Sequence, residues 1–297
     1  MEYREEMSCG NANIHIQVIS REKIEGFLTD LSFLNYRLAG IERRKGDIHQ
    51  KSDLQWDQTK VGKDLWWKDN CFHMIGHWEE GEVQKVLVCL FARKLEEEEL
   101  YPFHASGIRY QGKNIMFMGG ESNSGKSMSQ IEGCQRGGKI LSTETFIVDR
   151  CGDIVLGSKS VFLRKRTKGT ERTDKPDQDQ GIALFFKKSP DFVIYDGSEK
   201  KIDLVVLPDI DGHFETAVGK MTSYEKEYQT FHCICDYWGE RTLIASGLPM
   251  PLLDTDELRR KRASFISEFS QKSYYYIRGR TPQIILDEVE KVLEARG

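Results

Sequence analysis

The segment from Gly120 to Ser127 constrains this chain most, because its eight residues fit the pattern G-x-x-x-x-G-K-[ST] at every position. An apolar segment at 114–120 leads into it, and a helix-compatible segment at 127–136 follows it and ends at a Gly-Gly pair. This context predicts a strand, a phosphate-binding loop and a helix in succession. Glycines let several backbone N–H groups turn toward phosphate oxygens, and the helix N-terminus adds partial positive charge.

The residues of this loop have expected roles in binding a nucleotide. Lys126 is expected to reach the β- and γ-phosphates, and the Ser127 hydroxyl is expected to ligate Mg²⁺. The cofactors that we expect are therefore ATP and Mg²⁺. The candidate nucleotide-binding residues are Gly120, Glu121, Ser122, Asn123, Ser124, Gly125, Lys126, Ser127 and Met128.

The length and charge of the chain narrow its class. Its 297 residues suit about two domains. The 43 Lys and Arg residues against 47 Asp and Glu residues give a net charge of −4, which argues against nucleic-acid binding by bulk positive charge. No apolar run approaches the ~20 residues of a membrane helix, and the first residues lack the basic-then-apolar pattern of a signal peptide. We therefore expect a cytoplasmic protein without nucleic-acid or membrane partners.

The seven cysteines do not suggest a disulfide framework, because their number is odd and their spacing is irregular, which favours free thiols in a reducing compartment. Cys233 and Cys235 lie on a predicted strand, where with His232 they could begin a metal site. Buried thiols in that strand are the favoured interpretation. His73 and His77 lie in an apolar segment with a central glycine, which favours a strand or turn over a metal site.

Hydrophobic patterning predicts the elements of the first part of the chain. A half-buried strand is expected at 13–19, a helical or mixed segment at 22–34 and a buried strand at 85–93. The acidic run after the last of these marks a boundary. We therefore predict a small α+β domain over 1–98, followed by a second domain over 99–297.

The second part is predicted to contain both strands and helices. The predicted strands are 106–110, 114–120, 140–141, 146–149, 193–195, 202–208 and 274–279, and the predicted helices are 127–136, 216–231, 256–268 and 282–295. Residues 164–180 contain no large apolar residue and are a candidate lid. The cations in it that could neutralise a transferring phosphoryl group are Arg164, Lys165 and Arg166.

A carboxylate is expected near the loop, since P-loop proteins commonly place an Asp after an apolar strand as a second metal anchor. Asp209 and Asp211 follow the predicted strand at 202–208, although a polar turn is the favoured interpretation there. Glu144 follows the short strand after the loop helix and is the stronger candidate. Asp149 is a weaker one.

Three segments together resemble a known family: His104-Ala-Ser-Gly, the loop Gly120–Ser127, and Gly138-Lys-Ile-Leu-Ser-Thr-Glu144. In this arrangement the chain is similar to HPr kinase/phosphorylase and its relatives, which include kinases of a peptide serine. The resemblance implies an α/β (α+β) fold, in which a small α+β domain precedes a phosphoenolpyruvate-carboxykinase-like P-loop domain with a mixed sheet. It also implies that copies of the chain assemble into a homo-oligomer.

The resemblance gives three residues catalytic roles. Lys126 keeps its phosphate role, and His104 falls on the family's histidine near the phosphates. Glu144 falls on the second residue of an Asp-Asp pair, so it is expected to help hold Mg²⁺. Thr143 stands where kinases of this family have an Asp proposed as general base. A base must therefore come from elsewhere, be Glu144 itself, or not be needed.

These features predict an ATP-dependent kinase that transfers the γ-phosphoryl group to a hydroxyl acceptor, either a peptide or protein serine or a small metabolite. The N-terminal domain is the candidate for recognising the acceptor. The alternative, motivated by Thr143, is a nucleotide-binding regulatory or scaffold protein with little catalysis.

Overall fold

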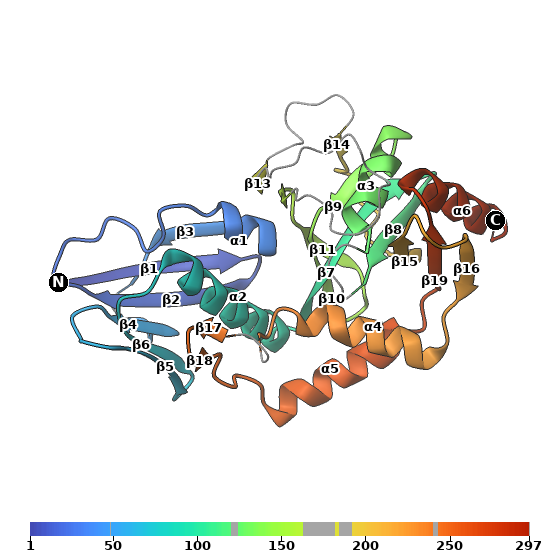
Figure 1. The fold of residues 1–297 in the computed structure, drawn as a ribbon. Coiled ribbons are helices and arrows are strands. Elements are labelled where there is room, and N and C mark those ends of the chain that lie inside the picture. Colours follow the sequence, from blue (N-terminus) through green and yellow to red (C-terminus); the bar gives the residue numbers. More distant parts are fainter. Residues whose placement is uncertain (48, 120–123, 163–181, 184–191, 240–242, 297) are drawn as a thin grey trace.

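The structure is a computed structural model, and it describes residues 1–47, 49–119, 124–162, 182–183, 192–239 and 243–296. Over these residues the fold is mixed α/β, with six helices and mixed sheets. Figure 1 shows one sheet at the N-terminal end of the molecule and a second, larger sheet beside it. None of the helices in the described part is long and apolar enough to cross a membrane.

The first sheet is built from residues 2–76. Its strands are β1 (Glu2–Cys9), β2 (Ala12–Ile19), β3 (Ile41–Lys45), β4 (Leu54–Asp57), β5 (Lys63–Lys68) and β6 (Cys71–Gly76), in the order β3-β1-β2-β4-β6-β5. The two pairs β2–β4 and β4–β6 are parallel and the others antiparallel. The predicted strand at 13–19 is confirmed as β2, and the segment with His73 is confirmed as strand β6.

The predicted strand at 85–93 is wrong, because this segment is part of helix α2 (Glu80–Glu97). The helix packs against β2 on one side and β7 on another, so its apolar residues surround most of its circumference. The sequence of a helix that is buried on most sides is a continuous apolar run. Hydrophobic periodicity cannot distinguish such a run from a buried strand. Within the segment predicted as helical or mixed at 22–34, only the start of α1 (Ser32–Arg37) is helical.

The second sheet has nine strands. They are β7 (Leu100–Tyr110), β8 (Lys113–Met118), β9 (Lys139–Ser142), β10 (Thr145–Asp149), β11 (Ile154–Gly157), β14 (Val193–Ile194), β15 (Leu204–Ile210), β16 (Ala217–Lys220) and β19 (Tyr274–Gly279). The main order is β11-β10-β7-β8-β15-β19-β16, and β9 pairs with both β7 and β14. Strands β8, β15 and β19 run parallel, whereas β7 is antiparallel to β8. Two further pairs stand apart: β12 (Val161–Phe162) with β13 (Ile182–Ala183), and β17 (Leu243–Ala245) with β18 (Leu248–Pro249).

Helices cover both faces of this sheet. On one face, α3 (Lys126–Gln135) and α6 (Pro282–Glu294) pack over Ile115 and Phe117 of β8. On the other face, α4 (Ser223–Cys235) and α5 (Asp256–Phe269) pack over Met116 and Met118. Successive residues of one strand thus enter opposite cores, as the two-residue period of a strand requires. The predictions of α3, α5 and α6 are confirmed.

The predicted helix at 216–231 is only partly correct. Residues 217–220 form β16, and α4 starts after Thr222, whose side chain and that of Glu225 cap each other's backbone N–H groups. The predicted strand around Cys233 and Cys235 is wrong, because both residues lie in α4. Side chains two residues apart on a helix point in different directions. The expectation that Cys233 and Cys235 share one face, on which the metal site depended, therefore does not hold.

The two sheets are joined through a common apolar core. The cluster under the first sheet also takes in Trp238, Leu253 and Leu258 from the second half of the chain. Buried Glu96 of α2 accepts hydrogen bonds from Trp238 Nε1 at 2.6 Å and Arg262 Nε at 2.9 Å. The N-terminal part is therefore anchored to the helices α4 and α5 rather than tethered by α2 alone.

Candidate functional site

The segment with the G-x-x-x-x-G-K-[ST] sequence connects strand β8 to helix α3 in the chain, so the strand before it and the helix after it are confirmed. Gly125 precedes the helix with φ of +111°, and a Cβ there would lie 2.6 Å from Ile210 on β15, so glycine is required twice over. Lys126 begins the helix, is only 8% exposed, and donates from Nζ to the Gly119 carbonyl at 2.8 Å. Ser124, Ser127 and Met128 are also described, whereas the predicted residues Gly120, Glu121, Ser122 and Asn123 lie outside the described residues.

His104 and Glu144 lie in contact beside this loop. His104 is on β7, opposite Thr145 of the neighbouring strand β10, and Glu144 immediately precedes that strand. His104 Nε2 is 2.9 Å from Glu144 Oε1, and both side chains are largely buried. On the other side of the ring, Nδ1 is 3.2 Å from Asp236 Oδ2, in a direction that falls short of a good hydrogen bond.

Arg37 completes the cluster from the N-terminal part of the chain. Its Nη2 is 2.7 Å from Asp236 Oδ2, its Nη1 is 3.4 Å from Glu144 Oε1, and its guanidinium lies 4.8 Å from the centre of the Tyr237 ring. The Arg37 carbonyl accepts a hydrogen bond from Thr145 Oγ1 at 2.9 Å. The sequence analysis missed Arg37 and Asp236, because no motif or spacing marks either residue.

The charges of the cluster shift the pKa values of its members. Burial raises the pKa of Glu144, but the nearby positive charges of His104, Arg37 and Lys126 outweigh burial and lower it to about 2. The pKa of Asp236 is likewise held below its ordinary range, against burial, by His104 and Arg37. Burial lowers the pKa of His104, yet its two carboxylate neighbours raise it above 6.5 overall. At neutral pH the cluster therefore holds ionised carboxylates and a histidine that retains its proton more strongly than usual.

The Thr143 hydroxyl makes structural hydrogen bonds and does not take the place of a general base in this cluster. It is fully buried, and its hydroxyl donates to the Ser158 carbonyl at 3.0 Å and also contacts the Ser160 carbonyl. The Ser158 hydroxyl in turn accepts from the backbone N–H groups of Glu144 and Thr145 at 3.0 and 2.9 Å. Thr143 thus helps to fix the backbone on which Glu144 is placed.

The other predicted acids are found in different settings. Asp209 is in strand β15 rather than a turn, and its Oδ2 accepts from Tyr276 Oη at 2.8 Å and from Arg278 Nε at 3.0 Å. Pro208 is tolerated there because the pairing of β15 with β8 ends at Val206. Asp211 lies beyond the strand and accepts from its neighbour His213 through backbone N–H at 2.9 Å.

Asp149 is at the far end of β10 from His104, where its Oδ1 accepts from the backbone N–H groups of two residues in the following turn. It is therefore not part of the cluster. The candidate lid at 164–180, with Arg164, Lys165 and Arg166, lies outside the described residues.

The described residues contain no group of three or more His, Cys, Asp or Glu side chains placed to hold a metal ion by themselves. Mg²⁺ typically takes one or two carboxylates together with phosphate and water. Ser127 at the start of α3 and the Glu144 carboxylate have the right chemistry for that role. His104 and Arg37 both contact Oε1 of Glu144.

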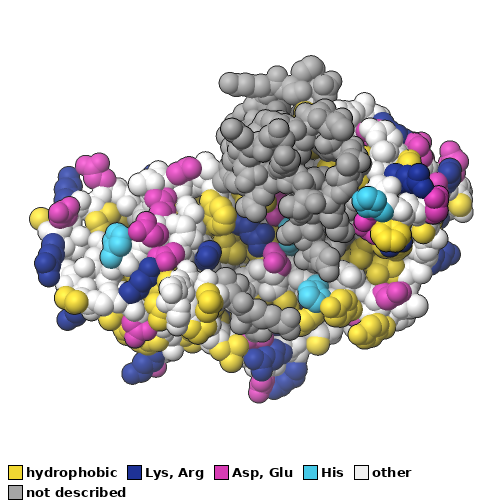
Figure 2. Space-filling view, viewed as in Figure 1, with side chains coloured by type: hydrophobic (Ala, Val, Ile, Leu, Met, Phe, Trp, Pro, Cys, Tyr) yellow, Lys and Arg dark blue, Asp and Glu magenta, His cyan; other side chains and the backbone are white. Residues whose placement is uncertain are grey.

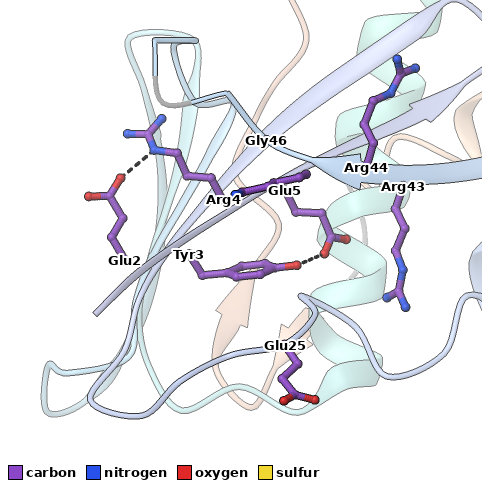
Figure 3. A pocket seen from close by; sticks show the side chains of 9 residues that line it. Glu2, Tyr3, Arg4, Glu5, Glu25, Arg43, Arg44 and Gly46 are labelled. Atoms are coloured by element: carbon purple, nitrogen blue, oxygen red, sulfur yellow. Dashed lines mark hydrogen bonds and ion pairs between the residues drawn. The ribbon is translucent and has the colours of Figure 1, made fainter.

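Two cavities differ in their relation to the loop. One of about 530 Å³ includes Gly119, Ser124 and Asp209 in its lining. A larger one of about 920 Å³ lies in the N-terminal part, between β1, the end of β3 and Glu25 (Figure 3). Its lining includes the Arg4–Glu2 ion pair and none of the predicted site residues. The smaller cavity is therefore the one relevant to the loop.

On the face drawn in Figure 2, acidic and basic side chains are interspersed among the described residues, and neither charge forms a region of its own.

Comparison with protein-family models and with curated proteins found no match for the chain.

Proposed function

We propose that this protein is an ATP-dependent kinase that transfers the γ-phosphoryl group to a hydroxyl acceptor. The observation that carries the proposal is the position of Lys126. It begins the helix after a loop of G-x-x-x-x-G-K-[ST] sequence, and its charge acts on the contacting pair His104 and Glu144. A triphosphate on this helix N-terminus would therefore present its terminal phosphate toward that pair.

The cluster supports this reaction through charge and positioning. A bond forms between the acceptor oxygen and the γ-phosphorus, the bond from that phosphorus to the β–γ bridging oxygen breaks so that ADP leaves, and the acceptor hydroxyl releases its proton to solvent. Lys126, Arg37 and, in its protonated form, His104 would place positive charge near the transferring group, which carries negative charge. Mg²⁺, held by Ser127 and Glu144, would supply further charge neutralisation.

A carboxylate with a pKa of about 2 is a weak base, so Glu144 is better suited to orient His104 and Arg37 than to abstract a proton. Phosphoryl transfer depends mainly on positioning and electrostatic stabilisation, which this arrangement provides. A serine side chain of a peptide or protein and a small hydroxylated metabolite both remain acceptors under this proposal.

Titration calorimetry with ATP and Mg²⁺ tests the nucleotide site. We expect Mg²⁺-dependent binding by the wild type, and a loss of at least tenfold in affinity in Lys126→Ala. Lys113→Ala is the matched control, because Lys113 is exposed at the opposite end of β8. Wild-type affinity in Lys126→Ala, or no binding by the wild type, would contradict the proposal.

The regulator alternative is favoured by one observation, the engagement of the Thr143 hydroxyl in structural hydrogen bonds. A regulator would bind ATP as tightly as a kinase but would leave it intact. Incubation with labelled ATP and a panel of serine peptides and polyols separates the two, since only the kinase forms ADP and a labelled acceptor.

A further inference from the structure

We propose that the cavity of about 530 Å³ beside the phosphate loop binds the nucleoside of the nucleotide, with Tyr224 and Tyr228 of α4 stacking on the base. This inference rests on the proposed function. The cavity lies near the ends of β8 and β15 and beside the middle of β19, and its wall on the helix side is α4. Its lining includes Gly119, Ser124, Asp209, Lys220, Met221, Tyr224, Tyr228 and Tyr276.

The His104–Glu144 pair and the cavity lie on opposite sides of the loop. On the β7 side, His104 and Glu144 lie within reach of the charge on Lys126. On the β15 side lies the cavity, which Gly119 and Ser124 of the loop line directly. A nucleotide whose terminal phosphate lies near Lys126 and His104 must extend away from them, and the cavity occupies the opposite side.

Helix α4 connects these two places. Tyr228 lies at the cavity and Asp236, the residue after the helix, contacts His104. Eight residues of helix separate them, which is about 12 Å along the axis. A ligand that contacts both ends must therefore be extended, with an anionic end and an end suited to aromatic side chains.

The tyrosines offer surface of the required kind. Tyr224 is 75% exposed and Tyr228 is 48% exposed, although large aromatic side chains are usually buried. Their ring centres are 6.2 Å apart with an angle of 22° between the planes, so the two rings are nearly parallel neighbours on α4. Any nucleobase can stack on an aromatic side chain, because stacking does not depend on the hydrogen-bond donors and acceptors of the base.

A second observation comes from the loop itself. Among the described residues the buried Oγ atom of Ser124 has no hydrogen-bond partner, yet Ser124 lines the cavity. A buried hydroxyl without a partner is unfavourable, so a polar ligand atom at this wall would satisfy it. The acceptor is the less suitable occupant, because it must approach the terminal phosphate on the other side of the loop.

Calorimetry with two probes, ATP and inorganic tripolyphosphate, tests the assignment. Tripolyphosphate carries the phosphates without the nucleoside. We expect the double variant Tyr224→Ala/Tyr228→Ala to bind ATP about tenfold to a hundredfold more weakly and to bind tripolyphosphate as the wild type does. Phe231→Ala is the matched control, since this exposed aromatic residue of α4 does not line the cavity and lines the neighbouring hollow between α4 and α5, which Tyr224 and Tyr228 also line. It should leave both affinities unchanged.

The outcomes are distinguishable. Unchanged ATP affinity in the double variant, or equal wild-type affinities for ATP and tripolyphosphate, would overturn the nucleoside assignment while leaving the phosphate site intact. If the wild type binds neither probe, the proposed function fails and this inference fails with it. Thermal melts check that the variants remain folded, which we expect because both tyrosines are exposed on one helix.

Discussion

Replacing Glu144 with Gln removes one negative charge from the cluster and keeps the size of the side chain. Glu144 is 10% exposed at its side chain, so its charge is only weakly screened by solvent. Its pKa is lowered from 4.5 to about 2 in the folded protein, chiefly by His104 and Arg37 against the effect of burial. Its ionised form therefore stabilises the fold.

The magnitude follows from the pKa difference. A lowered folded-state pKa gives stability that is present above the unfolded-state value of 4.5 and is lost as the pH falls toward the folded-state value of about 2. At pH 6 the contribution amounts to about 3 kcal/mol, and at pH 3.5 it has fallen to about 2 kcal/mol. Asp236 stays beside His104 in the variant, so the histidine keeps a counter-charge.

Urea unfolding of the wild type and Glu144→Gln at several pH values between 6 and 3.5 measures this directly. We expect the variant to be less stable by about 3 kcal/mol at pH 6, with the gap closing by about 1 kcal/mol at pH 3.5. Glu257→Gln is the control, because Glu257 is exposed on α5 and should change stability by no more than about 0.5 kcal/mol. A gap that stays constant over this range would refute the electrostatic reasoning and point to packing instead.

Two further predictions concern the framework of the site. Arg262→Met leaves the buried carboxylates of Glu96 and Asp254 without their shared cation, so we expect a loss of about 3–5 kcal/mol in urea unfolding. Adding Glu96→Gln to that variant should restore part of the loss, and no recovery would argue against the charge explanation. Gly107→Ala places a Cβ 2.5 Å from a carbonyl oxygen of β8, so we expect a lower melting temperature. Gly81→Ala on α2 meets no atom within 4 Å and should melt at or above the wild-type temperature, which makes it the matched control.

The strands and helices around the G-x-x-x-x-G-K-[ST] segment could be predicted because their signals are local. The Gln111-Gly112 turn fixes the hairpin of β7 and β8, and the paired glycines after Gln135 end α3. Thr281 and Pro282 likewise start α6 by satisfying or omitting N–H groups of the first turn. Each of these signals acts within a few residues of the backbone that it shapes.

Helix α2 could not be predicted in the same way. Its residues are apolar because they pack between the first sheet and β7, and that packing exists only once distant segments have come together. The start of α4 was missed for a related reason, since the short exposed strand β16 has weak hydrophobic patterning and is specified by its pairing with β19.

Local sequence signals were enough to predict a strand and a helix on either side of the G-x-x-x-x-G-K-[ST] segment, and motifs pointed to His104, Lys126 and Glu144 as candidate site residues. The surroundings of these three residues depend on tertiary packing. Arg37 is 107 residues from Glu144 and 199 from Asp236, and it contacts both because the last residue of α1 lies next to the residue that follows α4. Ion pairs between residues that are far apart in the sequence produce no local sequence pattern. The contacts of these residues are set by the packing of whole helices and sheets.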